Sequence, residues 1–220
     1  MRRQLLPALV LVALSTLVCG LAYPLFVTGI AQVAFPAAAD GSLVERDGEV
    51  VGSSLLGQEF TGEEWFQARP SAAGAAASGS YVEVLDEDGE PTGEVEAADP
   101  DDLADASSGG SNLGPTSEEL LTTVEERAVA YREANGLPAD AEVPVDAVTA
   151  SASGLDRHIS VANARLQAPR VAEVRGLDEA EVLALVDEHT EGRSLGFLGE
   201  PGVNVLELNL ALDELDGESG

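Results

Sequence analysis

The N-terminal segment limits what this chain can be more than any other feature. Arg2 and Arg3 precede residues 4–39, which carry no charge, and Asp40 opens a strongly acidic remainder. As a helix, Leu5 to Phe26 extends over about 33 Å, slightly more than a bilayer hydrocarbon core of about 30 Å. Paired arginines before the apolar run and acids after it favour a cytoplasmic N-terminus. The pattern therefore predicts one membrane anchor that carries a domain outside the cytoplasm.

In residue numbers, this prediction divides the chain into four parts. They are a cytoplasmic N-terminus (1–4), a transmembrane helix and its exit (5–35), an extracytoplasmic domain (36–216) and a short tail (217–220). Pro24 is expected to kink or end the helix unless neighbouring helices satisfy the freed backbone groups. Gly20 and Gly29 are small enough for another helix to approach closely. We expect Gly20, Pro24 and Gly29 to pack against a partner in the membrane.

Three other interpretations of the segment are weaker. A cleaved signal peptide normally has an apolar region of about 7 to 15 residues, whereas this run continues well past Cys19. A lipid anchor on Cys19 is disfavoured because the residues before it, Leu17 and Val18, are bulky. The length of the run argues against a buried helix of a soluble protein.

The formal net charge is −29, and every basic residue is an arginine. Such a charge repels itself at ordinary ionic strength, while molar salt shortens the Debye length to about 3 Å. We expect an acidic, halophilic protein from a salt-adapted prokaryote, and no nucleic-acid partner, because phosphates would be repelled. A single cysteine and two histidines make a disulfide framework or a zinc site improbable, so no metal ligands are predicted.

The remainder of the chain predicts an α+β domain. Asp47-Gly48 predicts a hairpin turn within 42–51. Apolar spacing predicts helices over 116–135, with a Thr116-x-x-Glu119 capping box, over 159–176, interrupted at Pro169, and over 178–190. Alternating leucines predict a strand over 206–212. Residues 74–107 form an acidic insertion in which Tyr81 to Leu85 could begin a small hairpin, and the spacing there does not fit a calcium loop.

Six further stretches have sequences that are too distinctive to be explained by a structural scaffold alone. They are 52–58, 66–73, 108–116, 148–160, 167–172 and 203–206. In this order behind one N-terminal span, they resemble the C subunit of the Kdp potassium-transporting ATPase, the KdpC family. The resemblance covers nearly the whole chain, although 74–107 is longer than the family's usual link.

The resemblance implies an accessory subunit of an ATP-driven, high-affinity potassium uptake complex. Its partners would be a potassium-channel-like subunit, a P-type ATPase subunit and a small helical subunit, with potassium as the transported ion. The family's C subunit is described as a catalytic chaperone that raises the ATPase subunit's affinity for ATP. Residues proposed for partner or nucleotide-related roles would be Gln167, Arg170, Ser111 and Asn112. The resemblance implies no catalytic residue and no tightly bound cofactor in this chain.

Plainer interpretations remain open for these residues. Ser111 and Asn112 can simply form a turn before a helix, and Gln167 and Arg170 can be packing neighbours three residues apart. Arg69 is expected to pair with a carboxylate. One rival is a free-standing, membrane-anchored extracellular binding protein, and another is a secreted hydrolase that uses Ser153 and His158. The hydrolase lacks a Gly-x-Ser-x-Gly elbow.

Overall fold

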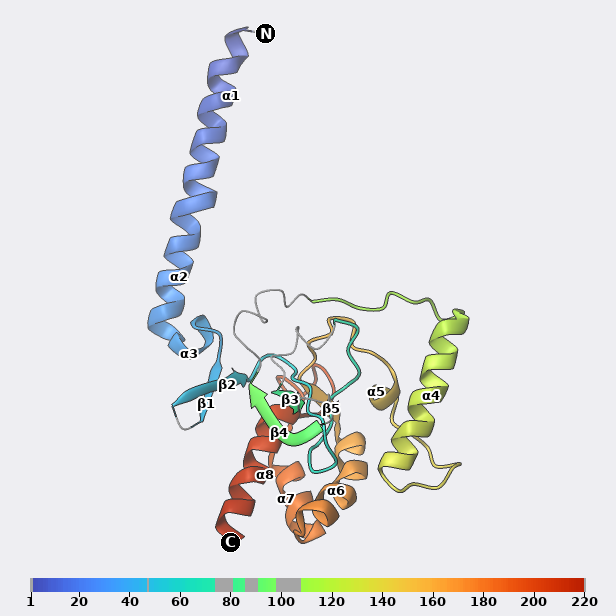
Figure 1. Cartoon of the computed structure of the whole chain (residues 1–220). Helices are drawn as coiled ribbons and strands as arrows, with labels where there is room; N and C mark the ends of the chain where they lie inside the picture. Colours follow the sequence, from blue (N-terminus) through green and yellow to red (C-terminus); the bar gives the residue numbers. More distant parts are fainter. Residues whose placement is uncertain (1, 47, 74–80, 86–90, 98–107, 220) are drawn as a thin grey trace. The chain divides into compact units, whose positions relative to one another are not determined.

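The computed structural model describes residues 2–46, 48–73, 81–85, 91–97 and 108–219. The chain divides into two compact units, Met1–Ser53 and Ser54–Gly220, which we call the N-terminal and C-terminal units. Each is described by itself (Figure 1). Helices and strands are both present, which agrees with the predicted mixed class.

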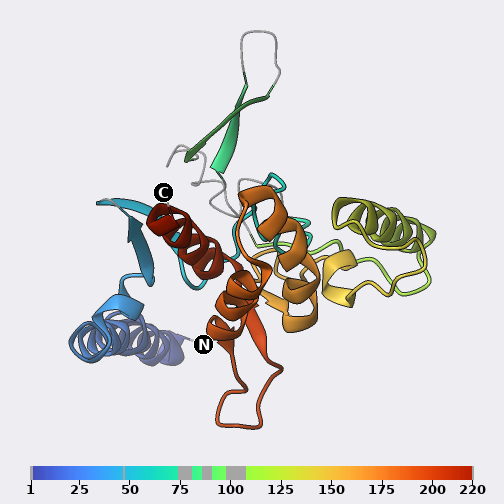
Figure 2. The same cartoon turned by 90° about the horizontal axis from the view of Figure 1, so that it is seen from below.

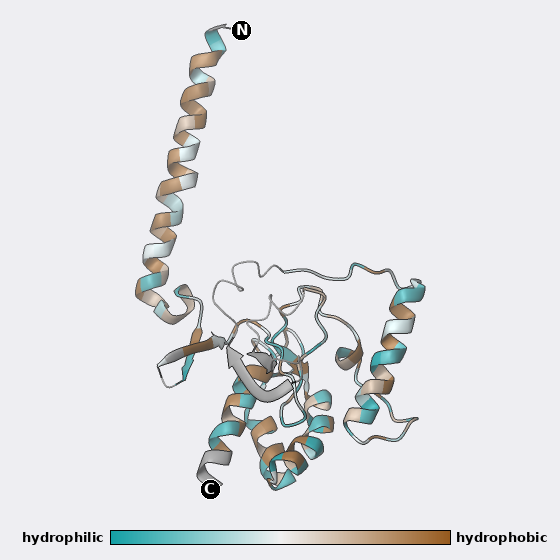
Figure 3. Ribbon diagram, viewed as in Figure 1, coloured by the Kyte–Doolittle hydropathy of each residue, from teal (hydrophilic) through white to brown (hydrophobic). Residues whose placement is uncertain are grey.

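The N-terminal unit begins with one long helical run. It comprises α1 (Arg2–Ser15), the π-helical segment η1 (Thr16–Ala22) and α2 (Tyr23–Ala34). Residues Arg3–Ala34 are, by length and composition, apolar enough to cross a membrane. Figure 3 shows hydrophobic residues along its length. The long apolar segment predicted from the sequence is thus helical.

Pro24 does not end this helix, so one of the two outcomes expected for it, a helix end, is not found. Proline has no N–H to bond to the carbonyl four residues earlier, and its ring crowds that carbonyl. The π-helical turns just before Pro24 absorb the mismatch, with the Tyr23 N–H bonded to the Val18 carbonyl five residues back. A Cβ added at Gly29 would meet no atom within 4 Å, so that side of the helix is open.

A short helix and a hairpin complete the N-terminal unit. Helix α3 (Pro36–Ala39) leads into β1 (Leu43–Arg46), which pairs antiparallel with β2 (Glu49–Ser53). Gly48 has φ +86°, as a tight turn requires, while Asp47 lies outside the described residues. The Ser53 hydroxyl donates to the Gly41 carbonyl at 2.7 Å. The predicted hairpin over 42–51 is confirmed.

The C-terminal unit is built around a small sheet and three helices. Strands β5 (His158–Ser160), β7 (Gly202–Asn204) and β6 (Thr190–Glu191) form an antiparallel sheet in that order. Helices α6 (Val161–Arg175), α7 (Glu179–Glu188) and α8 (Val205–Ser219) pack beside it. Their apolar faces supply most of the core, which includes Ile159, Ala164, Ala168, Val171, Val182, Val186, Val203, Leu206, Leu208 and Leu212.

Two helices lie farther from this core. Helix α4 (Glu118–Ala134) packs on α5 (Val145–Val148), and α4 has no buried residue. Its N-cap is Ser117, whose hydroxyl accepts from the Leu120 N–H, and not Thr116 as the capping-box pattern predicted. Ser117 takes this position because its backbone is extended (φ −69°, ψ 127°), as an N-cap requires.

Two other predicted elements were wrong. Helix α6 continues through Pro169 as a single helix. Its packing against α7 and the sheet outweighs the lost hydrogen bond. The predicted strand over 206–212 belongs to helix α8. Helix α7, in contrast, begins as predicted, with the Asp178 carboxylate capping the Ala180 N–H at 2.7 Å.

Part of the acidic insertion is also described. Within 74–107, β3 (Tyr81–Leu85) pairs antiparallel with β4 (Pro91–Ala97). This hairpin agrees with the one suggested by the apolar residues near Tyr81. Residues 86–90, which connect the two strands, lie outside the described part of the chain.

Candidate functional site

The segment 63–67 is held in place by side chains rather than by a neighbouring strand. Asn209 on α8 binds the peptide groups on both sides of Phe66: its Oδ1 accepts from the Phe66 N–H at 3.0 Å, and its Nδ2 donates to the Phe66 carbonyl at 3.0 Å. A carboxamide has one donor side and one acceptor side, so it can replace the peptide of a missing strand. Phe66 and Asn209 are both buried, which makes these bonds necessary.

Gln167 on α6 repeats this arrangement at the next residue. Its Oε1 accepts from the Gln67 N–H at 2.7 Å, and its Nε2 donates to the Gln67 carbonyl at 3.2 Å. The same Nε2 also donates to Asn163 Oδ1 at 2.9 Å. Gln167 is only 1% exposed, so its amide is committed to contacts inside the chain.

Arg170, one turn further along α6, binds the same segment. Its Nη1 donates to the Glu63 carbonyl, and its Nη2 donates to the Trp65 carbonyl and to Gln167 Oε1, both at 3.0 Å. Its Nε donates to Asn135 Oδ1 at 3.0 Å. Burial lowers the pKa of the Arg170 guanidinium, because a charge is disfavoured away from water. The hydrogen-bond acceptors of this buried guanidinium are neutral carbonyl and amide oxygens.

We call the side chains of Gln167, Arg170 and Asn209 that hold segment 63–67, together with Asn163, the clamp. Asn163 links the clamp to α4 and α5. The Tyr131 hydroxyl donates to Asn163 Oδ1 at 2.8 Å, and Asn163 Nδ2 donates to Asp146 Oδ2 at 2.9 Å. Asp146 also accepts from the Ser160 N–H and hydroxyl at 2.7 and 2.8 Å, at the start of α6. Burial, followed by the charge of Asp146, raises the pKa of the Tyr131 hydroxyl. Tyr131 therefore stays protonated as the donor that Asn163 needs.

Arg175 completes the contacts on 63–67. Its guanidinium lies 4.3 Å from the centre of the Trp65 ring, its Nε donates to the Glu64 carbonyl at 2.8 Å, and its Nη1 lies 3.0 Å from Asp213 Oδ1. Phe60 packs on the ring of Trp65, with the two ring centres 5.6 Å apart. Two helices, α6 and α8, thus fix one short irregular segment.

The loop 148–158 brings together most of the motifs that carried the resemblance. The Gly57 N–H bonds to the Leu155 carbonyl, the Ser151 N–H to the Pro70 carbonyl, and the Gly109 N–H to the Ser153 carbonyl. Arg69 pairs with Asp156 at 2.7 Å, as predicted for that arginine. A Cβ at Gly57 would lie 2.3 Å from the Asp156 carbonyl oxygen, so only glycine fits there.

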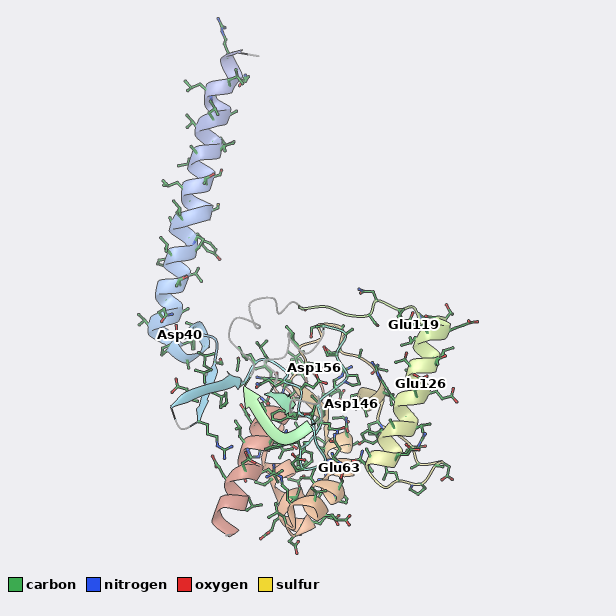
Figure 4. All side chains as sticks on the ribbon, viewed as in Figure 1. Asp40, Glu63, Glu119, Glu126, Asp146 and Asp156 are labelled. Atoms are coloured by element: carbon green, nitrogen blue, oxygen red, sulfur yellow. The ribbon has the colours of Figure 1, made fainter. Side chains whose placement is uncertain are left out.

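A hollow of about 680 Å³ opens between this loop and the clamped segment. Its lining includes Gln58, Gln67, Arg69, Tyr131, Asn163 and Gln167. Figure 4 places Asp146 and Asp156 in the middle of the unit, whereas Glu119 and Glu126 lie along α4. Several lining residues bind one another: Gln167 with Gln67 and Asn163, Tyr131 with Asn163, and Arg69 with Asp156.

The predicted site residues fall in three separate places. Gln167 and Arg170 are in direct contact in the clamp. Ser111 and Asn112 are exposed on the segment before α4, where Asn112 Nδ2 donates to the Gly110 carbonyl. Gly20, Pro24 and Gly29 lie in the N-terminal helix.

The hydrolase hypothesis gains no support from the geometry. The Ser153 hydroxyl lies 3.1 Å from the Ser151 hydroxyl and accepts from the Leu155 N–H. His158 Nε2 lies 3.3 Å from Glu191 Oε2. The two residues thus have different partners. Sequence reasoning also missed the clamp residues Asn163 and Asn209; a single amide among apolar positions, as in Leu208-Asn209-Leu210, is the signal that could have found Asn209.

Comparison with known proteins gives the class to which this fold and these motifs belong. The family model KdpC, described as the c chain of a K⁺-transporting ATPase, matches residues 5–214. The chain belongs to this family, and the resemblance inferred from its motifs is confirmed.

Three relatives illustrate the extent of the match, and all are described as the KdpC subunit of a potassium-transporting ATPase. The one from Mycobacterium tuberculosis is 51% identical over 215 residues, which cover 98% of this chain and 100% of the relative. That from Rhodospirillum rubrum is 51% identical and covers 97% of both chains. That from Kineococcus radiotolerans is 52% identical over 211 residues, 96% of this chain and 93% of the relative.

Proposed function

We propose that this chain is the accessory C subunit of an ATP-driven potassium uptake complex of the Kdp type. The observation that carries the proposal is the family match over 5–214, which spans the apolar N-terminal helix and the clamped domain together. The partners are a potassium-channel-like subunit, a P-type ATPase subunit and a small helical subunit. We expect the chain itself to perform no covalent chemistry, and the polar side chains of the clamp are engaged in holding 63–67.

Co-purification tests this assembly role. An affinity tag on this chain should recover the two large membrane subunits from detergent extracts of cells that express the whole complex. A stable lone monomer would instead favour the rival, a free-standing extracellular binding protein that uses the 680 Å³ hollow. Growth on limiting potassium, lost on deletion of this chain and restored by its return, provides the functional readout.

We also propose a topology with residues 1–4 in the cytoplasm, one membrane span within 5–35, and residues 36–216 outside. Arg2 and Arg3 before the uncharged run, and acids from Asp40 onward, support this orientation. Gly20, Pro24 and Gly29 would face another helix of the complex, because the small glycines let a neighbouring backbone approach closely.

Accessibility labelling tests the topology. Cys19 is replaced by Ala, and single cysteines are introduced as Asp40→Cys and Arg3→Cys. An impermeant maleimide should label the first variant in intact cells and the second only after lysis. Labelling of Arg3→Cys in intact cells, with Asp40→Cys protected, would reverse the orientation and overturn the proposal.

For the ATP-related role of the family we propose an indirect mechanism. ATP is cytoplasmic, whereas the topology proposed above places Gln167 and Arg170 outside. In addition, the four donor contacts of Arg170 and the amide contacts of Gln167 are made within the chain. These residues would shape the surface that the complex recognises, and the effect on ATP affinity would pass through shared conformational equilibria. Ser111 and Asn112, which are exposed, would belong to the contact surface.

Calorimetry distinguishes indirect from direct action. The purified chain should bind no ATP, while omission of the chain from the complex should raise the KM for ATP. ATP binding by the chain alone, weakened in Arg170→Lys, would show direct contact and refute the indirect mechanism.

Finally, we propose that the chain is adapted to concentrated salt. A net charge of −29 favours unfolding by self-repulsion unless salt screens it. The urea midpoint should therefore rise between 0.1 and 2 M KCl; an unchanged midpoint would reject the adaptation.

A further inference from the structure

The loop 193–200, between β6 and β7, is an ordered projection from the sheet of the C-terminal unit (Figure 2). Its base is closed by an ion pair between Arg193 and Glu200 at 2.5 Å. Within it, the Leu198 N–H bonds to the Ser194 carbonyl at 2.9 Å, and the Gly196 N–H bonds to the Arg193 carbonyl at 3.0 Å. The tip therefore has a defined shape before it meets any partner.

This tip exposes large apolar side chains. Leu195 is 82% exposed, Phe197 is 69% exposed and Leu198 is 50% exposed. Leu195 also has φ +55°, a left-handed backbone that a leucine adopts only under strain. A strained backbone that turns apolar side chains outward has no benefit for the isolated fold. It is explained when another surface covers those side chains.

The charge distribution points in the same direction. Residues 192–199 contain no acid, although the chain carries 40 acidic residues among its 220. Only Arg193 is charged in this stretch, and Glu200 pairs with it. The solvent-exposed surface of a strongly acidic protein is interrupted here by an uncharged apolar tip.

We propose that the tip formed by Leu195, Phe197 and Leu198 inserts into an apolar pocket of another subunit of the potassium-transporting complex. This inference rests on the assembly role proposed above. The acids that flank the tip, Glu191 and Glu200, are 46% and 79% exposed in their side chains. The receiving pocket is accordingly apolar at its centre, with a neutral or basic rim.

A protein pocket fits these observations better than a lipid surface. Loops and helices that enter anionic bilayers carry clusters of Lys or Arg beside their apolar residues. Here Glu191 and Glu200 flank the tip, and each is paired with an arginine, Glu191 with Arg157 and Glu200 with Arg193. Beside the tip these arginines are engaged with acids and do not form the cluster of free cations that anionic headgroups attract.

Site-specific photo-crosslinking tests the proposal in the assembled complex. A benzoylphenylalanine at position 197 should give an adduct with another subunit, and one at position 121, an exposed leucine of α4, serves as the control. An adduct with lipid, an adduct within the same chain, or no adduct at position 197 overturns the proposal. Recovery of the complex through the tag is verified first, so that failure of the assembly role is recognised separately.

A pair of variants gives the energetic counterpart. Phe197→Asp should weaken association with the complex about tenfold or more, as removal of a central apolar anchor does. Leu121→Asp, 59% exposed in the wild type, should leave association unchanged. Both variants should unfold at the urea midpoint of the wild-type chain. Undiminished association of Phe197→Asp, with the wild type associating normally, refutes the inserted tip.

Discussion

Apolar side chains are usually buried and polar side chains exposed. Helix α6 and the loop 193–200 each depart from this rule, in opposite ways. Helix α6 buries Asn163, Gln167 and Arg170, whereas the loop exposes Leu195 and Phe197. The difference lies in their partners. The polar groups of α6 find donors and acceptors within the chain, while the apolar tip of the loop remains open to solvent. Buried polar residues here build the fold, and the exposed apolar residues of the loop are those that we propose to contact a partner.

The largest effect is expected when the buried charge of Arg170 is removed. Arg170→Leu would leave the carbonyls of Glu63 and Trp65 and the Asn135 side chain without their donor. We expect the free energy of unfolding to fall by about 4 kcal/mol, because buried acceptors would lose charged donors. Urea unfolding of the full chain in detergent measures it.

The matched control for Arg170 is Arg165→Ala on the same helix. Arg165 forms an exposed ion pair with Asp187 at 2.7 Å, and its loss should cost less than about 1 kcal/mol. Equal effects of the two substitutions would contradict a structural role for the buried guanidinium.

A somewhat smaller loss is expected for Asn209→Leu. The substitution keeps the shape of the side chain but leaves the N–H and C=O of Phe66 unpaired in the interior. We expect about 3 kcal/mol of destabilisation from these two groups. Thermal unfolding of the same detergent preparation provides the measurement, and a change below about 1 kcal/mol would show that water replaces the clamp.

The pH dependence of the free energy of unfolding should show that folding favours the neutral hydroxyl of Tyr131. Its folded-state pKa is raised above the unfolded value of about 10, so the neutral hydroxyl is favoured by folding. The associated stability is complete below pH 10 and is lost as the pH rises toward the folded-state pKa. The unfolding midpoint should therefore decrease as the pH rises above 10, and this decrease should be smaller in Tyr131→Phe. An identical slope in the two proteins would contradict this coupling.

The smallest effect is expected at the loop. Phe197→Asp should change the free energy of unfolding of the isolated chain by less than about 0.5 kcal/mol, because the side chain already faces solvent. This near-zero effect sharpens the comparison, since the same substitution should weaken assembly. A large loss of chain stability, measured by urea unfolding, would place Phe197 among the residues that hold the fold.

The parts that could be predicted from the sequence depend on local or periodic signals. The uncharged run from Gln4, the turn at Gly48 and the cap at Asp178 each act through neighbouring residues. The strand predicted for Leu206 to Leu212 failed because alternating leucines satisfy two geometries. As a helix, α8 buries Leu208 and Leu212 on one face, with Leu206 also covered, so its buried face is wide.

The candidate site was only partly predictable. The resemblance singled out Gln167 and Arg170, but it did not indicate that they bind the backbone of 63–67. Bonds between side chains and an irregular segment leave no periodic pattern, and they join residues about a hundred positions apart. The cap at Ser117 and the continuous helix through Pro169 depend likewise on tertiary contacts that no short window contains.

The long separation within the clamp has a consequence for biosynthesis. Phe66 and Asn209 are separated by 143 positions, and Gln67 and Gln167 by 100. Phe66 is therefore synthesised long before Asn209, and its peptide groups lack this partner until helix α8 has been translated. A product truncated before α8 would lack Asn209 and leave the aromatic segment around Phe66 without its partner, so we expect quality-control proteases to degrade it.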